Sequence, residues 1–174
     1  KIAAHAGGSK NLKTVKECFT SLQALKLSSY QIVKVVANKG GSINLNAVQE
    51  CFTSLKELNF TADQIIKIAA HDGGSKNLKA VQECFTCLQA LNLTADQIVK
   101  IAAHDGGAKN LNAVKECFTN LQALNLSAGQ IVKIAAHHGG SKNINAVKEC
   151  FTSLQALNFN ANQILKIACH NGGS

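Results

Sequence analysis

Proline and arginine are both absent from this 174-residue chain, and no apolar run approaches the length of a membrane span. Without proline, we expect the helices to run without kinks. Without a membrane-length run or a visible signal peptide, we expect the chain to have no membrane partner.

The lack of arginine also limits how this chain can contact a partner. Its 18 basic residues are all lysines, and the formal net charge is +8. A basic chain favours an acidic partner, with nucleic acid as the first candidate. Lysine binds phosphate as a point charge, but the planar fork that arginine presents to guanine is missing. Any base reading must therefore come from other side chains.

Two adjacent glycines recur every 33 residues, and the residue just before each pair is the one that changes most. The pairs are Gly7-Gly8, Gly40-Gly41, Gly73-Gly74, Gly106-Gly107, Gly139-Gly140 and Gly172-Gly173, and the variable residues are Ala6, Lys39, Asp72, Asp105, His138 and Asn171. A period of this length predicts a solenoid, whose units pack on their neighbours. A constant scaffold with one variable loop position is typical of a protein that reads a linear target.

We interpret residues 1–174 as a single repeat array. It comprises a partial repeat 1–26, the full repeats 27–59, 60–92, 93–125 and 126–158, and a partial repeat 159–174. Because the chain begins and ends within a repeat, we expect it to be a piece of a longer array without its capping segments.

Each repeat predicts two helices, so the expected fold is all-α. In the repeat 93–125, Thr94 and Gln97 have the spacing of a capping box that opens a short helix, and the same spacing recurs at Ser28, Thr61 and Ser127. We expect Gly106-Gly107 to end that helix, because glycine accepts the left-handed backbone of a helix end or a turn. A longer helix follows, with an apolar stripe of helical period. The stripe consists of Leu111, Val114, Phe118, Leu121 and Leu124.

Seven cysteines raise the possibility of disulfides or a metal. Five occupy one equivalent position, a repeat apart and too far for a disulfide: Cys18, Cys51, Cys84, Cys117 and Cys150. Cys84 and Cys87 are the only close pair. We interpret the cysteines as small buried hydrophobic side chains in a reducing compartment.

A histidine, or once an asparagine, stands two places before each glycine pair: His5, Asn38, His71, His104, His137 and His170. One histidine per loop cannot converge on a tetrahedral zinc centre, so we expect no metal. No nucleophile accompanies each histidine, so we expect neither an enzyme nor a cofactor. Instead, these side chains are predicted to brace the loop by bonding to an unpaired carbonyl of the first helix.

Shortly after each glycine pair, a lysine marks the start of the second helix: Lys10, Lys76, Lys109 and Lys142, with Ile43 as the exception. Free N–H groups and the helix dipole make such a start an anion site. A second lysine recurs on the first helix: Lys1, Lys34, Lys67, Lys100, Lys133 and Lys166. For this second row, a solvated face and a phosphate contact both stay open.

The segment Leu93-Thr-Ala-Asp-Gln-Ile-Val-Lys-Ile-Ala-Ala-His-Asp-Gly-Gly107 resembles the first half of a transcription activator-like effector (TALE) repeat. Lys109 to Phe118 resembles the second half more loosely, and the resemblance extends in register over the whole chain. The 33-residue length is similar to the TALE-like proteins of bacteria other than the plant pathogens, including marine ones. The plant-pathogen repeat carries a proline where this chain has Thr20, Thr53, Thr86, Thr119 and Thr152.

The resemblance implies a right-handed superhelix around duplex DNA, with each loop meeting one base in the major groove. The implied base-reading residues are Ala6, Lys39, Asp72, Asp105, His138 and Asn171, and the residues before them brace the loops. The implied phosphate-binding residues are Gly7, Gly8, Lys10, Gly40, Gly41, Gly73, Gly74, Lys76, Gly106, Gly107, Lys109, Gly139, Gly140 and Lys142. Carboxylates select cytosine and lysine favours guanine, so Lys39, Asp72 and Asp105 predict G-C-C. Asn171 predicts a purine, whereas Ala6 and His138 are left open.

The sequence also bears on two other classes of function. A protein-binding solenoid would vary across a helix face, whereas this chain varies at one loop position. A reader of single-stranded RNA needs exposed aromatic side chains for stacking. Five of the seven phenylalanines are instead expected in the core: Phe19, Phe52, Phe85, Phe118 and Phe151. We therefore expect a monomer that binds double-stranded DNA and no small-molecule substrate, in the cytoplasm or nucleoid, or in a host nucleus if translocated.

Overall fold

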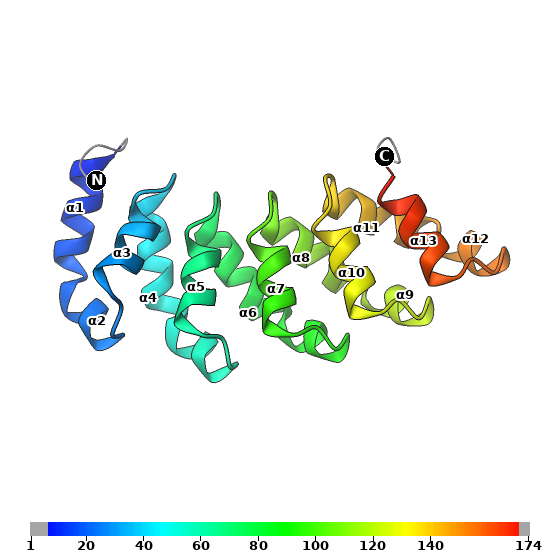
Figure 1. The fold of residues 1–174 in the computed structure, drawn as a ribbon, viewed down its shortest axis with the longest axis horizontal. Helices are drawn as coiled ribbons and strands as arrows, with labels where there is room; N and C mark the ends of the chain where they lie inside the picture. The colour runs from blue at the N-terminus through cyan, green and yellow to red at the C-terminus, as the bar shows by residue number, and fades with distance from the viewer. Residues whose placement is uncertain (1–6, 171–174) are drawn as a thin grey trace. The chain divides into compact units, whose positions relative to one another are not determined.

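The structure, a computed structural model, describes residues 7–170, and every regular element within this range is an α-helix (Figure 1). The prediction of an all-α fold is confirmed. The helices are α1 (Gly8–Glu17), α2 (Phe19–Ala24), α3 (Ser29–Val36), α4 (Gly41–Glu57), α5 (Ala62–Ala69), α6 (Gly74–Ala90), α7 (Ala95–Ala102), α8 (Gly107–Glu116), α9 (Phe118–Ala123), α10 (Ala128–Ala135), α11 (Gly140–Glu149), α12 (Phe151–Ala156) and α13 (Ala161–Ala168).

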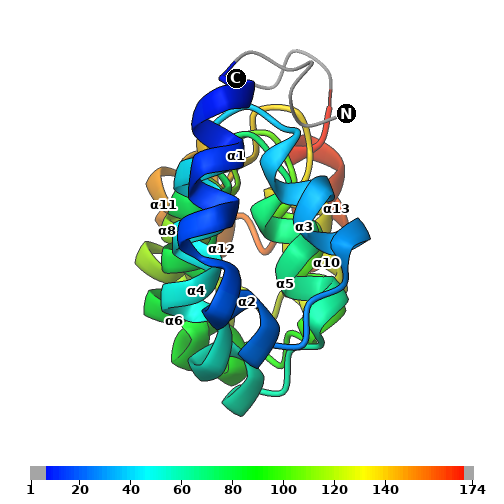
Figure 2. The ribbon, with the colours of Figure 1, turned by 90° about the vertical axis from the view of Figure 1, so that its left-hand side faces the viewer.

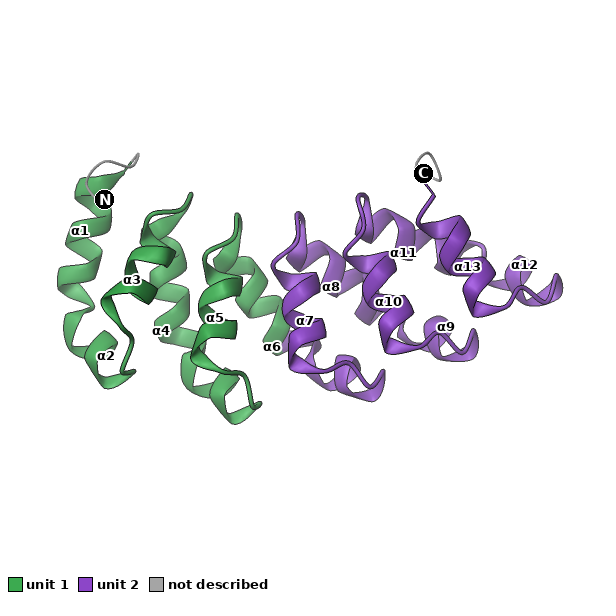
Figure 3. Cartoon of the chain, in the orientation of Figure 1, with its two compact units in different colours: residues 1–82 green, residues 83–174 purple. Residues whose placement is uncertain are grey.

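The chain divides into two compact units, Lys1–Gln82 and Glu83–Ser174, and the division falls within α6 (Figure 3). In the first unit, the short helices α3 and α5 contact each other, and the longer helices α1 and α4 do the same. Figure 2 shows these two pairs as separate layers. In the second unit, α7, α10 and α13 pack in succession, and α8 contacts α11. Within each unit, a short helix therefore packs on the short helix of the next repeat, and a longer helix on the next longer helix.

The short helices α3, α5, α7 and α10 begin with the predicted capping box, and α13 begins with one at Asn160 that was not predicted. The Thr94 hydroxyl accepts a hydrogen bond from the Gln97 backbone N–H at 3.3 Å, and the Gln97 side chain accepts one from the Thr94 N–H at 2.8 Å. Ser28, Thr61 and Ser127 begin their helices in the same way. These bonds pair two backbone donors that a helix start would otherwise leave unpaired.

The glycine pair begins the longer helix rather than ending the short one, which corrects the expectation from the sequence. The helix α7 already ends at Ala102, and Gly106, at a φ of 73°, is the N-cap of α8. The second glycine is required for a different reason. A Cβ built on Gly107 would overlap the carbonyl oxygen of Ala102. The short loop therefore folds tightly against the end of the helix that it follows.

The longer helix is interrupted at Cys18, Cys117 and Cys150, so the expectation of an unkinked helix was wrong in these repeats. At Cys117, φ is −96° and ψ is 6°, well away from the helical ψ of about −42°. The helices α4 and α6 run through the same position for 17 residues each. An absence of proline therefore does not guarantee a continuous helix, because one residue with a ψ near zero is enough to interrupt it.

The apolar stripe forms the core, with Leu111, Val114 and Leu121 fully buried. The five phenylalanines expected in the core differ from one another: Phe52 is buried, whereas Phe85, Phe118 and Phe151 are only half-buried. Phe19 is 57% exposed, because no helix precedes α1 in the described residues to cover it. Cys150 is also exposed. The Cys117 thiol contacts the Ile144 carbonyl on the longer helix of the next repeat, whereas the described residues contain no such helix after α12.

Candidate nucleic-acid interface

The loops between the short and the longer helix share one backbone arrangement. In the fourth repeat, the N–H of Gly107 donates to the His104 carbonyl at 2.9 Å, which closes a turn around Asp105 and Gly106. The same bond joins Gly41 to Asn38, Gly74 to His71 and Gly140 to His137. The loop geometry is therefore repeated although the residue at its tip changes.

The variable residues Lys39, Asp72, Asp105 and His138 all have exposed side chains. Their backbones are held in the turn described above, so the variation affects what the loop presents and leaves its shape unchanged. The predicted base-reading residues Ala6 and Asn171 lie outside the described residues, as does the predicted loop brace His5.

A buried asparagine on the longer helix is hydrogen-bonded to the backbone of each of these loops. The side-chain amide of Asn110, which is 2% exposed, donates to the carbonyl of Asp105 at 3.1 Å. The equivalent bonds run from Asn44 to Lys39 at 3.2 Å, from Asn77 to Asp72 at 3.3 Å and from Asn143 to His138 at 3.1 Å. In every described loop from the second repeat to the fifth, the variable residue is thus tied to the core through its carbonyl.

The same asparagines also join one loop to the next. The Asn44 side-chain oxygen accepts from the N–H of Ser75 at 3.0 Å, and that of Asn110 accepts from the N–H of Ser141 at 2.8 Å. Ser75 and Ser141 directly follow the glycine pair of the following repeat. The side-chain amide of Asn44 or Asn110 therefore fixes the tip of its own loop. It also fixes the backbone just after the glycine pair of the following repeat.

Sequence reasoning assigned no role to this asparagine, although it stands at one position of all five longer helices: Asn11, Asn44, Asn77, Asn110 and Asn143. The signal was available. Asparagine is uncommon inside a protein, and a polar residue that recurs on the buried side of an amphipathic helix needs hydrogen-bond partners. Asn11 departs in detail, because its amide donates to the Val36 carbonyl at 2.8 Å.

The predicted loop-bracing residues lie beside the loops and make two kinds of contact. The Asn38 amide donates to the Lys34 carbonyl at 2.5 Å, which is the kind of helix-end bond expected from the sequence. The histidine contacts run forward instead. Nδ1 of His104 lies 3.4 Å from the Asp105 carbonyl, and Nδ1 of His137 lies 3.1 Å from the His138 carbonyl. His71 and His170 occupy the equivalent positions.

The predicted phosphate-binding lysines Lys10, Lys76, Lys109 and Lys142 are all exposed at the third residue of a longer helix. The first turns of these helices contain no acidic residue, so the helix dipole is not offset by a carboxylate there. The backbone donors are fewer than the sequence suggested. The N–H groups of Gly107 and Gly140 donate within their own loops, and the N–H of Ser141 donates to Asn110.

Two neighbouring variable residues contact each other. The Lys39 ammonium lies 3.4 Å from a carboxylate oxygen of Asp72, and both side chains are largely exposed. An ion pair between consecutive loop tips shows that adjacent variable side chains in the first unit are within reach of one another.

The buried cysteines are poor candidates for nucleophiles. Burial raises the pKa of the Cys84 thiol to about 11, and burial likewise raises the pKa of Cys51 and Cys117. The thiolate is the reactive form of cysteine, so these side chains are protonated near neutral pH. Among residues 7–170, no group of three or more histidines, cysteines or carboxylates is arranged to hold a metal ion.

A family model described as the TAL effector repeat matches residues 72–104. The matched segment begins at the variable residue Asp72 and ends at His104, so it covers one full period. The match supports a TALE-like repeat in this chain and suggests a DNA-binding repeat family. No curated protein matches the chain. In the described part of the chain, none of the helices is both long and apolar enough to cross a membrane.

Proposed function

We propose that this chain is a sequence-specific reader of duplex DNA in which each repeat contacts one base pair in the major groove. The observation that carries the proposal is that the loop combines a variable, exposed side chain with a backbone held in one arrangement. The variable side chains of Lys39, Asp72, Asp105 and His138 are exposed, whereas buried asparagines hold the backbone beneath them in one arrangement.

The chemistry of the exposed side chains sets the expected base preferences. The carboxylate of Asp72 or Asp105 can accept from the N4 amino group of cytosine, while guanine offers it only acceptors in the major groove. Lys39 can donate to the O6 and N7 acceptors of guanine. Repeats two to four therefore read G-C-C, and the base read by His138 is left to experiment. No bond is made or broken, so the proposed activity is binding without catalysis.

The scaffold and its positive charge complete the proposed interface with DNA. Neighbouring repeats continue as a right-handed superhelix that follows the groove, and the chain acts as a monomer. Lys10, Lys76, Lys109 and Lys142 contact phosphates near the loops, together with the first glycine of each pair. The N–H of the second glycine already donates within its own loop at Gly41, Gly74, Gly107 and Gly140. The lysines supply the part of the affinity that depends on salt.

Replacing Asp105 by Asn is the sharpest test of base reading. The substitution removes the negative charge and supplies an amide that can donate to purine N7. Preference at the one base pair opposite this repeat should move from cytosine toward a purine, by about 1–3 kcal/mol of discrimination. Affinity is measured for the four single-base variants of a site obtained by selection from random duplex DNA.

Asp96→Asn serves as the matched control, because it makes the same change of charge on α7, outside the loop. It should leave all four affinities in their original order. An equal loss for all four sites with Asp105→Asn, or no change, would contradict base reading by Asp105. Failure of the parent chain to select any duplex sequence would instead favour a protein-binding solenoid.

A further inference from the structure

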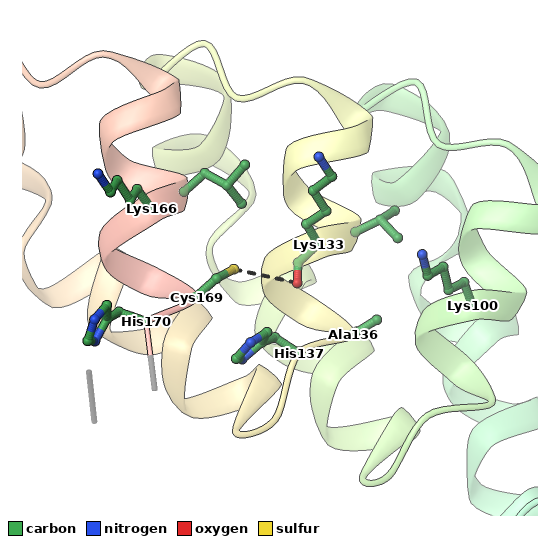
Figure 4. A pocket seen from close by; sticks show the side chains of 9 residues that line it. Lys100, Lys133, Ala136, His137, Lys166, Cys169 and His170 are labelled. Atoms are coloured by element: carbon green, nitrogen blue, oxygen red, sulfur yellow. Dashed lines mark hydrogen bonds between the residues drawn. The ribbon is translucent and has the colours of Figure 1, made fainter. Parts of the chain in front are cut away.

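An open hollow lies along the short helices of the second unit, next to the loops but separate from their tips. It has a volume of about 650 Å³ and is lined from α7, α10 and α13. Figure 4 shows a lysine on each of these three helices, Lys100, Lys133 and Lys166, with His137 and His170 at the ends of α10 and α13. The lysines are the row for which the sequence left two roles open.

The hollow has an apolar floor beneath a cationic rim. Val132, which is 3% exposed, forms part of the floor together with Ala136, Leu165 and Cys169. The Cys169 thiol donates to the Lys133 carbonyl at 3.7 Å, which joins α13 to α10 along this floor. Burial raises the pKa of Cys169, so its thiol is neutral. Among the described residues that line the hollow, none carries a carboxylate to neutralise the three lysines.

The same positions line a second hollow in the first unit. A hollow beside α3 is lined by Val33, Lys34, Ala37 and Asn38. These residues stand three whole periods before Val132, Lys133, Ala136 and His137. The share of the lining that one short helix contributes, a lysine beside apolar residues, therefore recurs in the first unit. A surface repeated with the period of the reading loops suits a partner that is itself a regular polymer.

We propose that this surface binds the sugar–phosphate backbone of duplex DNA, as a second row of contacts beside the loop lysines. Lys100, Lys133 and Lys166 pair with phosphates, and the apolar floor receives the C–H edge of the deoxyribose. The inference rests on the proposed function, because it adds contacts to the same duplex. His137 connects the two surfaces, since it lines the hollow and directly precedes the loop-tip residue His138.

The test compares two pairs of lysines that carry the same charge. Lys100→Gln with Lys133→Gln removes two lysines of the hollow, and Lys115→Gln with Lys148→Gln removes two exposed lysines of the longer helices. Affinity for the selected duplex is measured over a range of salt concentrations. The hollow pair should flatten the slope of log K against log salt by about 1.8, from about 0.9 per phosphate contact. The control pair should leave the slope unchanged.

Two further measurements keep the outcomes distinct. The double variant Lys100→Arg with Lys133→Arg keeps both charges and should retain the parent slope of log K against log salt. Neither this arginine pair nor the glutamine pair at the same positions should alter base preference. An unchanged slope in the hollow pair, or an equal change in both glutamine pairs, would overturn this inference while leaving the proposed function intact. If the parent chain does not bind duplex DNA, the proposed function itself is wrong.

Discussion

The second and fourth repeats have the same loop backbone but differ in the side chains at the loop tip and beside it. In the second, Lys39 is the variable residue, Asn38 bonds back to the Lys34 carbonyl, and Ile43 is 58% exposed where other repeats have a lysine. In the fourth, Asp105 is the variable residue, His104 reaches forward to the Asp105 carbonyl, and Lys109 is exposed.

The two loops share a buried asparagine that is hydrogen-bonded to the loop backbone. Asn44 and Asn110 are each 2% exposed, and each donates to the carbonyl of its variable residue and accepts from the following repeat. Because these bonds involve only the backbone of the loop, a positive and a negative side chain can occupy the same tip without altering its geometry. The scaffold is therefore independent of the residue that it presents.

The largest effect is expected where the two loops are identical. Gly107→Ala should destabilise the fold by about 2–4 kcal/mol, because the new Cβ overlaps the Ala102 carbonyl oxygen and the loop must move. Gly41→Ala should behave alike, because its Cβ meets the Val36 carbonyl oxygen in the same way. Urea unfolding followed by circular dichroism measures both changes.

Gly129→Ala is the control for these two substitutions. A Cβ at Gly129 meets nothing within 4 Å, and the residue lies in the first turn of α10. Alanine should therefore stabilise the chain there by up to about 1 kcal/mol through its higher helix propensity. Equal losses at Gly129 and Gly107 would show that the close approach of the loop is not the cause.

The next effect concerns the asparagine that links two loops. Asn110→Leu fills a similar volume but leaves the Asp105 carbonyl and the Ser141 N–H without their partner, which should cost about 1–3 kcal/mol of stability for each unpaired group. Base discrimination should weaken opposite Asp105 and His138, and at no other repeat. Binding to single-base variants of the selected site measures this pattern.

Asn145→Leu provides the comparison, because Asn145 is exposed on the next longer helix. It should leave both stability and base preference close to those of the parent chain. A loss of discrimination spread evenly over all repeats in Asn110→Leu would mean that the asparagine supports the fold without positioning particular loops.

A smaller effect should follow from exchanging the residues that distinguish the two loops on the phosphate side. Ile43→Lys adds a cation where the second repeat has none, and should steepen the slope of log K against log salt by about 0.9. Lys109→Ile should flatten the slope by a similar amount and weaken all DNA sequences alike. A shift in base preference from either exchange would be inconsistent with a contact to phosphate.

The smallest effect is expected from the ion pair between Lys39 and Asp72. Both side chains are largely exposed, so the ion pair should contribute little to the free energy of unfolding. A double-mutant cycle on that free energy, with Lys39→Gln and Asp72→Asn, should give a coupling below about 1 kcal/mol. The coupling should vanish at 1 M salt, where the screening length is about 3 Å. A coupling that survives high salt would indicate that the two loop tips are joined by more than their charges.

Much of the local structure was predictable because it depends on residues close together in the chain. The capping boxes of Ser28, Thr61, Thr94 and Ser127 formed as expected, since their partners lie three residues away. The left-handed turn at the end of each longer helix was missed, although Asn59, Asn92, Asn125 and Asn158 have positive φ there. Asparagine tolerates that conformation better than most residues, so this signal too was in the sequence.

The period and the residue types by themselves determined that the chain is helical, where its short helices begin and which side chains vary at the loop tips. They did not determine what the glycine pair is for, because the overlap at Gly107 involves the carbonyl of a helix that ends five residues earlier. Nor did they show that Asn110 holds two loops 33 residues apart, or that Lys100 and Lys133 share a hollow. Hydrogen bonds and surfaces of this kind exist only once neighbouring repeats have packed together, so only the tertiary structure decided them.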